Sequence, residues 1–315
     1  MCYRSAFKRG LALFISGVII SACSPKNADD ALIKTHKPSA IINGEKVTEL
    51  TKDPLAPLIV KLSLYYFDEK SDDIGTTNCT GVLIHPRIVL TAAHCIVGTE
   101  EAGLTRNGAL VKLPQKQFFP SLVAKNYDQS IAKKVLFAYV HPGFTGKLNR
   151  KRFNDIALAF LDAPLYDDAT WSELPTLKFD SKGRVTPPAI VTAYGFGATD
   201  VFYDADGYRD YEFDSSLRRK NFRLVSETEA HPALWRADDA IYLTPQSTDE
   251  PGSICDGDSG GAAFAKIDGH YIVVGVTSYV VGSCKHDAAL MSLKYHIKWV
   301  QEKIREGLSR LRESR

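Results

Sequence analysis

Short apolar or alternating runs bounded by turn residues recur through most of this chain, and they limit its fold more than any other feature. Each has the length of a β-strand, and none before residue 293 shows the 3.6-residue period of an amphipathic helix. Strands at such spacing, without helices between them, are typical of antiparallel barrels and sandwiches, so the sequence predicts an all-β protein. The runs are Leu58–Tyr66, Cys79–Ile84, Ile88–Ala92, Ala109–Leu113, Val135–Val140, Ile156–Leu161, Ala189–Tyr194, Asn221–Ser226, Ala240–Leu243, Ala262–Lys266, Tyr271–Tyr279 and Ala288–Leu293.

The C-terminal end follows a different pattern. Ile297, Val300, Ile304, Leu308 and Leu311 are three or four residues apart, which places them on one face of a helix. We therefore expect a C-terminal helix over about residues 294–312. The 315 residues are enough for one large domain or for two smaller ones that share an interface.

The first 22 residues have the pattern of a secretory signal. Arg4, Lys8 and Arg9 precede an apolar run over residues 11–20, which is too short to cross a bilayer as a helix. The segment Ile20–Cys23 resembles the lipobox of bacterial lipoproteins, which implies a lipid on Cys23; a plain signal cleavage nearby is the alternative. Residues 23–40 are polar and lack periodicity, as expected of a tether or propeptide. We expect an exported protein, in the periplasm, on the outer membrane or released from it, that contacts the membrane only through this lipid.

The net charge of +2 includes three cations of the leader, so the mature chain is close to neutral. This argues against nucleic acid as a partner. Two of the six cysteines are not available for disulfides, because Cys2 is removed with the leader and Cys23 takes the lipid. The remaining four, in an oxidising compartment, imply two disulfides, for which the sequence allows three connectivities. A zinc site is the alternative, but no C-x-x-C pair is present.

Three short segments stand out because they carry residues with catalytic chemistry. They are Thr91–Cys95 (TAAHC), Asn154–Leu158 (NDIAL) and Gly257–Gly261 (GDSGG). A serine hydroxyl is a poor nucleophile near neutral pH, so Ser259 needs a neighbouring base that takes its proton and later returns it to the leaving group. The imidazole of His94 suits both steps, and Asp155 would fix its tautomer. The plain alternative is a core histidine, a capping aspartate and a glycine-rich turn.

In this order, the three segments resemble the chymotrypsin/trypsin family of serine peptidases over about residues 41–303. The resemblance implies two six-stranded antiparallel β-barrels, over about residues 41–170 and 185–293, before the C-terminal helix, all within a peptidase domain of residues 41–315. It implies His94, Asp155 and Ser259 as the catalytic triad, and protein or peptide substrates with no cofactor and no metal. A monomer is expected.

The family pattern also assigns supporting residues. The amides of Gly257 and Ser259 would form the oxyanion hole, and Ser278 matches the serine that supports the triad acid. Cys79 matches the partner of Cys95, and Cys255 matches the partner of Cys284.

Two other functions are alternatives to a serine peptidase. The string Gly257–Gly261 also satisfies the G-x-S-x-G elbow of lipases and esterases, but that elbow needs a helix directly after the serine, and a hairpin pattern follows here. The second rival is a protease-like binding protein that has lost its activity. All three triad residues and the glycines are present, which favours the enzyme.

The segment Ile41–Gly44 (IING) resembles the mature N-terminus of the family, where cleavage frees an isoleucine amine that inserts beside the aspartate preceding the nucleophile. Here that aspartate is Asp258, and the cleaved bond would join Ala40 to Ile41. A zymogen is therefore expected, and Ala40 fits the preference described next, so self-activation is a further hypothesis.

Specificity is inferred from positions matching the family pocket. Ser253 stands at the pocket floor, where an acid would bind basic side chains, and Val280 stands where many members have glycine. We therefore expect small or medium aliphatic residues before the scissile bond, with Ser253, Ser278 and Val280 contacting the substrate.

Overall fold

The computed structural model describes the chain from Ile41 to Glu313, apart from several loops. The described ranges are 41–49, 52–68, 73–97, 110–112, 121–144, 153–203, 209–234, 236–246, 252–281, 284 and 286–313. The expected signal peptide and tether, with Cys23 and Ala40, lie outside the described residues.

The first barrel is a closed ring of six antiparallel strands. Pairing of its outermost strands with each other removes both free edges of the sheet. A further short strand, β5 (Leu110–Lys112), pairs with β7 outside this ring. In ring order the strands are β7 (Ala132–Val140), β6 (Ser121–Lys125), β2 (Ile59–Asp68), β3 (Asp73–His85), β4 (Ile88–Thr91) and β8 (Ala157–Leu161).

The second barrel repeats this plan with six antiparallel strands closed by the β13–β14 pairing. β1 (Glu45–Lys46) pairs with β13, and β9 (Leu177–Phe179) lies parallel to β16. A separate hairpin consists of β11 (Asp200–Tyr203) and β12 (Arg209–Glu212). In ring order the barrel strands are β13 (Arg218–Val225), β10 (Ile190–Gly195), β15 (Ala262–Ile267), β16 (His270–Val280), β17 (Ala288–Ser292) and β14 (Ala240–Pro245).

The fold prediction is confirmed, with two differences in detail. Residues 121–125, which the sequence analysis did not single out, complete the first ring as β6, while the predicted run at 109–113 only adds to its outside. The reason is that β6 directs one large apolar side chain, Leu122, and the small Ala124 into the barrel, which leaves a weak pattern. Residues 41–46 also join the second barrel rather than the first, because β1 pairs with β13.

The three largest apolar clusters of the described residues hold the barrels together. Alternate residues of β2, such as Leu62 and Leu64, fill the first barrel, and Phe222 and Leu224 of β13 help to fill the second. A third core joins the two barrels and includes Phe160 from the first and Phe264 from the second. Burial of this shared surface fixes one barrel against the other, as a site between them requires.

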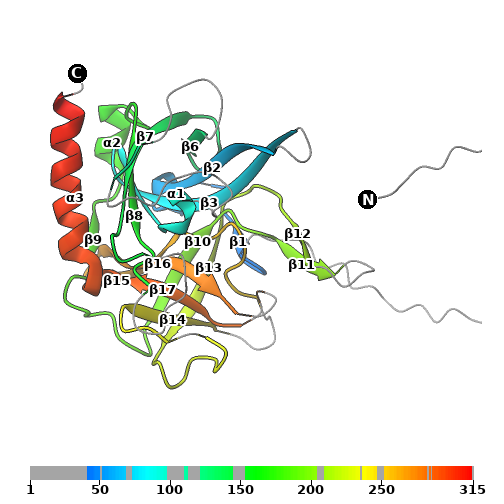
Figure 1. Cartoon of the computed structure of the whole chain (residues 1–315). Coiled ribbons are helices and arrows are strands. Elements are labelled where there is room, and N and C mark those ends of the chain that lie inside the picture. The colour runs from blue at the N-terminus through cyan, green and yellow to red at the C-terminus, as the bar shows by residue number, and fades with distance from the viewer. Residues whose placement is uncertain are drawn as a thin grey trace, which may run out of the picture. The chain divides into compact units, whose positions relative to one another are not determined.

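Helices are few among the described residues. The C-terminal helix is α3 (Leu293–Glu313), close to the expected bounds, and it packs against β8 of the first barrel and β16 of the second (Figure 1). Its buried residues include Ile297, Val300 and Leu311 of the predicted face. The others are η2 (Ala56–Leu58), α1 (His94–Val97) and α2 (Asp168–Glu173). None of the helices in the described ranges has the length and apolar character needed to cross a bilayer.

Gly307 of α3 allows close packing of the helix on the first barrel. A Cβ atom at this position would overlap the fully buried ring of Phe160. Glycine-to-alanine changes inside helices usually stabilise by up to about 1 kcal/mol. Here we expect Gly307→Ala to lower the free energy of unfolding by about 1–3 kcal/mol, because the buried ring has to move. Denaturant unfolding measures this, with the exposed Gln301→Ala as a neutral control; a stabilised Gly307→Ala protein would contradict the packing.

Candidate active site

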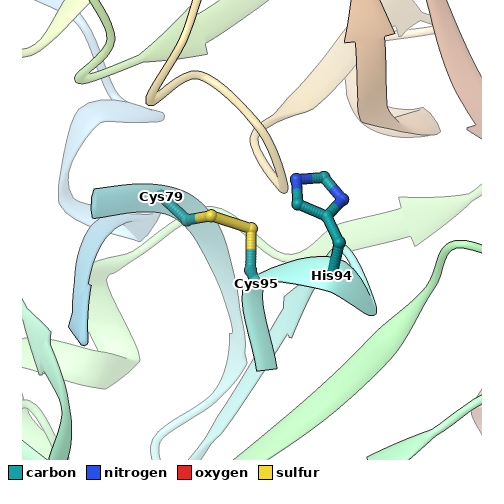
Figure 2. A group of neighbouring side chains, drawn as sticks. All are labelled: Cys79, His94 and Cys95. Atoms are coloured by element: carbon teal, nitrogen blue, oxygen red, sulfur yellow. A yellow bond between two sulfur atoms is a disulfide. The ribbon is translucent and has the colours of Figure 1, made fainter. Parts of the chain in front are cut away.

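His94 begins the short helix α1, directly after β4 of the first barrel, and two hydrogen bonds fix it to Asp155. The Nδ1 atom of its ring lies 2.7 Å from Oδ2 of Asp155, and its backbone amide donates to Oδ1 at 2.9 Å. The disulfide between Cys79 and Cys95 lies beside it (Figure 2). The imidazole side chain is 37% exposed, and it lines a cleft.

Asp155 lies in the loop that enters β8, and it is buried. Besides His94, it accepts a hydrogen bond of 2.6 Å from the hydroxyl of Ser278 on β16. Burial by itself raises the pKa of Asp155, but the charge and hydrogen bonds of His94, with the Ser278 hydroxyl, outweigh it and lower the pKa. The carboxylate is therefore ionised at neutral pH and holds Nδ1–H of His94.

His94 shows the matching shift. Burial by itself lowers the pKa of His94, but the charge and hydrogen bond of Asp155, together with the charge of Asp256, outweigh it and raise the pKa above its ordinary value. An imidazole with this environment is a stronger base than a free histidine, and it stabilises the proton that it accepts.

Asp239, a residue that the sequence analysis did not single out, supports the loop of Asp155. Its buried carboxylate accepts hydrogen bonds from the backbone amides of Phe153, at 3.0 Å, and Asn154, at 2.9 Å. Nε2 of His296 from α3 lies 3.2 Å from the same carboxylate. Burial by itself raises the pKa of Asp239, but the contacts with His296 and the two amides outweigh it and lower the pKa. No sequence motif marks this cluster, because Asp239, His296 and the two amides come from three distant segments of the chain.

Ser259 lies in the loop between β14 and β15 of the second barrel, and it lines the same cleft as His94. Two glycines give the loop its shape, since Gly257 has φ of +92° and Gly260 has φ of +82°. These values suit glycine alone. Within the described part of the chain, the backbone amides of Gly257 and Ser259 have no acceptor, so both are free to bind an anionic oxygen.

The cleft has a volume of about 380 Å³ and takes its walls from both barrels. Val280 and Ile254 line it, with Asp256 also contributing. Ser253 does not: it is fully buried, and its hydroxyl has no hydrogen-bond partner among the described residues. The remaining lining residues are Phe144, Phe153, Asp155, Tyr211, Cys255, Thr277, Ser278 and Tyr279.

Ile41 lies beside Asp258, the residue before Ser259. Its side chain is fully buried in the second barrel, and its backbone amide hydrogen bonds to the Asp258 carboxylate. The amides of Gly197, at 2.7 Å, and Cys255, at 2.9 Å, bind the same carboxylate. Burial raises the pKa of Asp258 to about 7, the charge of Asp256 adds to the rise, and the amides oppose it.

The structure contains the two disulfides Cys79–Cys95 and Cys255–Cys284. These are the pairs that the family resemblance implies. Because each sulfur is bonded to its partner, none of the four carries the thiolate that a zinc site would need.

Comparisons with known proteins agree with this arrangement. A family model described as Trypsin matches residues 63–300. The chain is 26% identical over 248 residues to kallikrein-1E2 of Equus caballus, covering 74% of this chain and 82% of that protein. It is 28% identical over 279 residues to phenoloxidase-activating enzyme 1 of Spodoptera litura, covering 84% and 67% respectively. It is also 28% identical over 229 residues to prostatic glandular kallikrein-6 of Rattus norvegicus, covering 70% and 73%. With two closed six-stranded barrels, a cleft between them and a family match over most of its length, the chain belongs to the trypsin family of serine peptidases.

Proposed function

We propose that the protein is a serine endopeptidase that acts through an acyl-enzyme on Ser259. The Ser259 hydroxyl attacks the carbonyl carbon of the scissile bond while His94 takes its proton. His94 then gives that proton to the leaving amine, and a water molecule releases the acyl group by the reverse sequence. The pair of hydrogen bonds from His94 to the buried Asp155 carries this proposal, because it orients a base toward the cleft that Ser259 lines.

The amides of Gly257 and Ser259 are proposed as the oxyanion hole. Negative charge develops on the attacked carbonyl oxygen, and amides held in place before the reaction stabilise it without reorganisation. Each such donor contributes about 2.7–4 kcal/mol to the transition state. The absence of any acceptor for these two amides among the described residues supports the assignment.

A fluorophosphonate probe tests the proposal against the rival function, an inactive protease-like binding protein. The probe reacts with a serine that has an oriented base, so protein starting at Ile41 should be labelled at Ser259. The Ser259→Ala protein is the control and should not react. Folded protein that fails to label would favour the binding protein instead.

We also propose that cleavage between Ala40 and Ile41 activates a zymogen. The new ammonium group of Ile41 would pair with the Asp258 carboxylate, whose hydrogen-bond donors within the described ranges are the neutral amides of residues 41, 197 and 255. Asp258 directly precedes Ser259, so this pair would stabilise the loop that carries the oxyanion amides. The burial of Ile41 supports the idea.

The proposed specificity is for small or medium aliphatic residues before the scissile bond. The cleft has an apolar wall from Val280 and Ile254, which favours aliphatic over charged side chains. Ser253, at the position where an acid would bind basic side chains, has no carboxylate, and this is consistent with a preference for uncharged residues.

Replacing Val280 should widen this specificity. We expect Val280→Gly to raise kcat/KM for peptides with aromatic residues before the scissile bond by about tenfold or more relative to alanine peptides, since a few methyl groups decide such preferences. A peptide library measures the change. Val281→Gly is the matched control, because the residue follows Val280 but does not line the cleft. An unchanged profile in Val280→Gly would exclude this wall from the binding of that residue.

We propose that the exported protein carries a lipid on Cys23, a residue outside the described ranges. The leader and the segment Ile20–Cys23 support this assignment. When the full chain is expressed in bacteria with radiolabelled palmitate, we expect Cys23→Ser to lose the label. Cys2→Ser should keep it, because that residue leaves with the leader. Label retained by Cys23→Ser would favour the plain signal cleavage.

A further inference from the structure

Four consecutive carbonyl groups of the nucleophile loop each accept a hydrogen bond. The Asp256 oxygen accepts from the amide of Ala198 at 2.7 Å, and the Asp258 oxygen accepts from that of Gly261 at 3.0 Å. The other two carbonyls, of Gly257 and Ser259, are both held by one residue. That residue is Thr80 of β3, which belongs to the opposite barrel.

The amides of the same loop fall into two groups. Those of Asp258, Gly260 and Gly261 donate to backbone oxygens, whereas those of Gly257 and Ser259 find no acceptor in the described ranges. Gly257 and Ser259 are only partly buried, and Ser259 lines the cleft, so an oxygen of a bound substrate can supply the acceptor that these two amides lack. The direction of the two free amides is therefore set by the contacts of the carbonyls around them.

Thr80 makes four hydrogen bonds at this junction and is fully buried. Its hydroxyl donates to the Gly257 oxygen at 2.9 Å and accepts from the amide of Phe196 at 3.1 Å. Its amide donates to the Ser259 oxygen at 2.8 Å, and its own oxygen accepts from the Thr91 hydroxyl at 2.9 Å. The neighbouring Cys79–Cys95 disulfide ties Thr80 to the segment that carries His94.

We propose that the Thr80 hydroxyl is a positioning residue for the oxyanion hole: by holding the Gly257 carbonyl it fixes the peptide bond between Gly257 and Asp258, so that the peptide bonds on either side keep the amides of Gly257 and Ser259 directed at the substrate. This inference rests on the proposed function. The backbone amide of Thr80 would be present with any residue except proline at this position, but the link to Gly257 needs a hydroxyl.

The backbone conformation at Gly257 depends on this hydrogen bond because the residue is a glycine. Gly257 has no Cβ to restrict its backbone, and its φ of +92° is one of several that glycine can adopt. Without the hydroxyl, the buried Phe196 amide and the partly buried Gly257 oxygen would both lose their partner, which favours rotation of the peptide bond between Gly257 and Asp258 toward water in the cleft. A carbonyl turned into the cleft would oppose the negative charge of the transition state and leave the binding of the uncharged substrate nearly unchanged.

The test compares Thr80→Val, which keeps the shape and removes the hydroxyl, with Thr80→Ser, which keeps the hydroxyl. Three quantities are measured on protein starting at Ile41: kcat and KM for an alanine peptide, and the affinity for a peptide boronic acid, which mimics the tetrahedral transition state. For Thr80→Val we expect kcat and the boronate affinity to fall together, by roughly ten- to a hundredfold, with KM nearly constant. Thr80→Ser should remain close to the wild type.

Several outcomes would overturn the inference. Thr80→Val with unchanged kcat would show that the hydroxyl is not needed, and equal losses in Thr80→Ser would assign the effect to packing. If substrate and boronate both bind more weakly by the same factor, so that KM rises, the substitution has distorted the cleft in general. If Thr80→Val does not fold, Thr80→Ala takes its place, and failure of both to fold would assign Thr80 to folding alone. Wild-type protein that neither labels nor hydrolyses peptides would reject the proposed function itself, whatever the Thr80 variants do.

Discussion

Asp155→Asn is expected to reduce kcat by about 10⁴ while the protein stays folded. The asparagine amide would present N–H groups to Nδ1 of His94, so the ring would carry its proton on Nε2 and could not accept one from Ser259. The buried site keeps its shape because the two side chains have nearly the same volume. Thermal unfolding verifies the fold, and steady-state kinetics measure the loss. Asp162→Asn, an exposed acid just beyond β8, should keep full activity.

Asp155→Asn should also change the pH dependence of kcat/KM. Below the pKa of His94 the ring is protonated and cannot take the Ser259 proton, so kcat/KM falls as the pH falls. Because the contacts with Asp155 raise that pKa, the acid limb of the wild-type profile should have its midpoint above about 6.5. Removal of the Asp155 charge should shift the midpoint of the residual activity downward. A midpoint that does not move, or a kcat within tenfold of the wild type, would show that Asp155 does not support the base.

Asp258→Asn is expected to lower the activity of protein starting at Ile41 by two to four decades. An ammonium group inserted beside a neutral amide is a buried charge without a partner, and loss of one partner from such a pair costs about 3–5 kcal/mol, at about 1.4 kcal/mol per decade. The active loop would then be a minor population. Fluorophosphonate labelling rates measure this, with Asp268→Asn in the exposed β15–β16 turn as the control. Full activity in Asp258→Asn would contradict activation through this pair.

The uncleaved chain offers a second measurement. The folded-state pKa of Asp258 is about 7, against about 3.9 for an unfolded aspartate, so the folded protein holds a proton that the unfolded chain has released. The protonated Asp258 therefore stabilises the folded protein. This contribution to the free energy of unfolding is fully present below the pKa of the unfolded chain, about 3.9, and is lost as the pH rises through the folded-state pKa of about 7. We expect the uncleaved Ser259→Ala protein to lose a few kcal/mol of unfolding free energy across this range. Adding Asp258→Asn should flatten the curve, and an unchanged slope would assign the titration to another group.

Several features of the fold and site could be predicted from the sequence because they are local. The strands of the second barrel each show an apolar run, and the helix face at Ile297, Val300 and Leu311 repeats with the helical period. The segments around His94, Asp155 and Ser259 are short and contiguous, so their residue types indicated serine peptidase chemistry before any geometry was known. The family resemblance then implied two six-stranded barrels, which the structure contains.

Other features had no local pattern. β6 is short, with one large inward side chain, and became visible only through its pairing with β2 and β7. Nothing in the sequence distinguishes Asp239 from an ordinary surface acid. In the structure its carboxylate accepts hydrogen bonds from the amides of Phe153 and Asn154, which lie more than eighty residues away in the sequence. Ser253 matched a pocket position in the sequence, yet in the structure it is fully buried and does not line the cleft.

The amino-acid sequence by itself determined the residue types that carry the chemistry and the alternation that makes strands, because both depend on neighbours a few positions apart. The tertiary structure alone decided which backbone groups remain free at the cleft and which side chains hold the others in place. Thr80 shows the physical reason: a threonine in a strand is common, and its hydroxyl acquires a specific role only when the closing of two barrels brings Gly257, 177 residues further along the chain, within hydrogen-bonding distance.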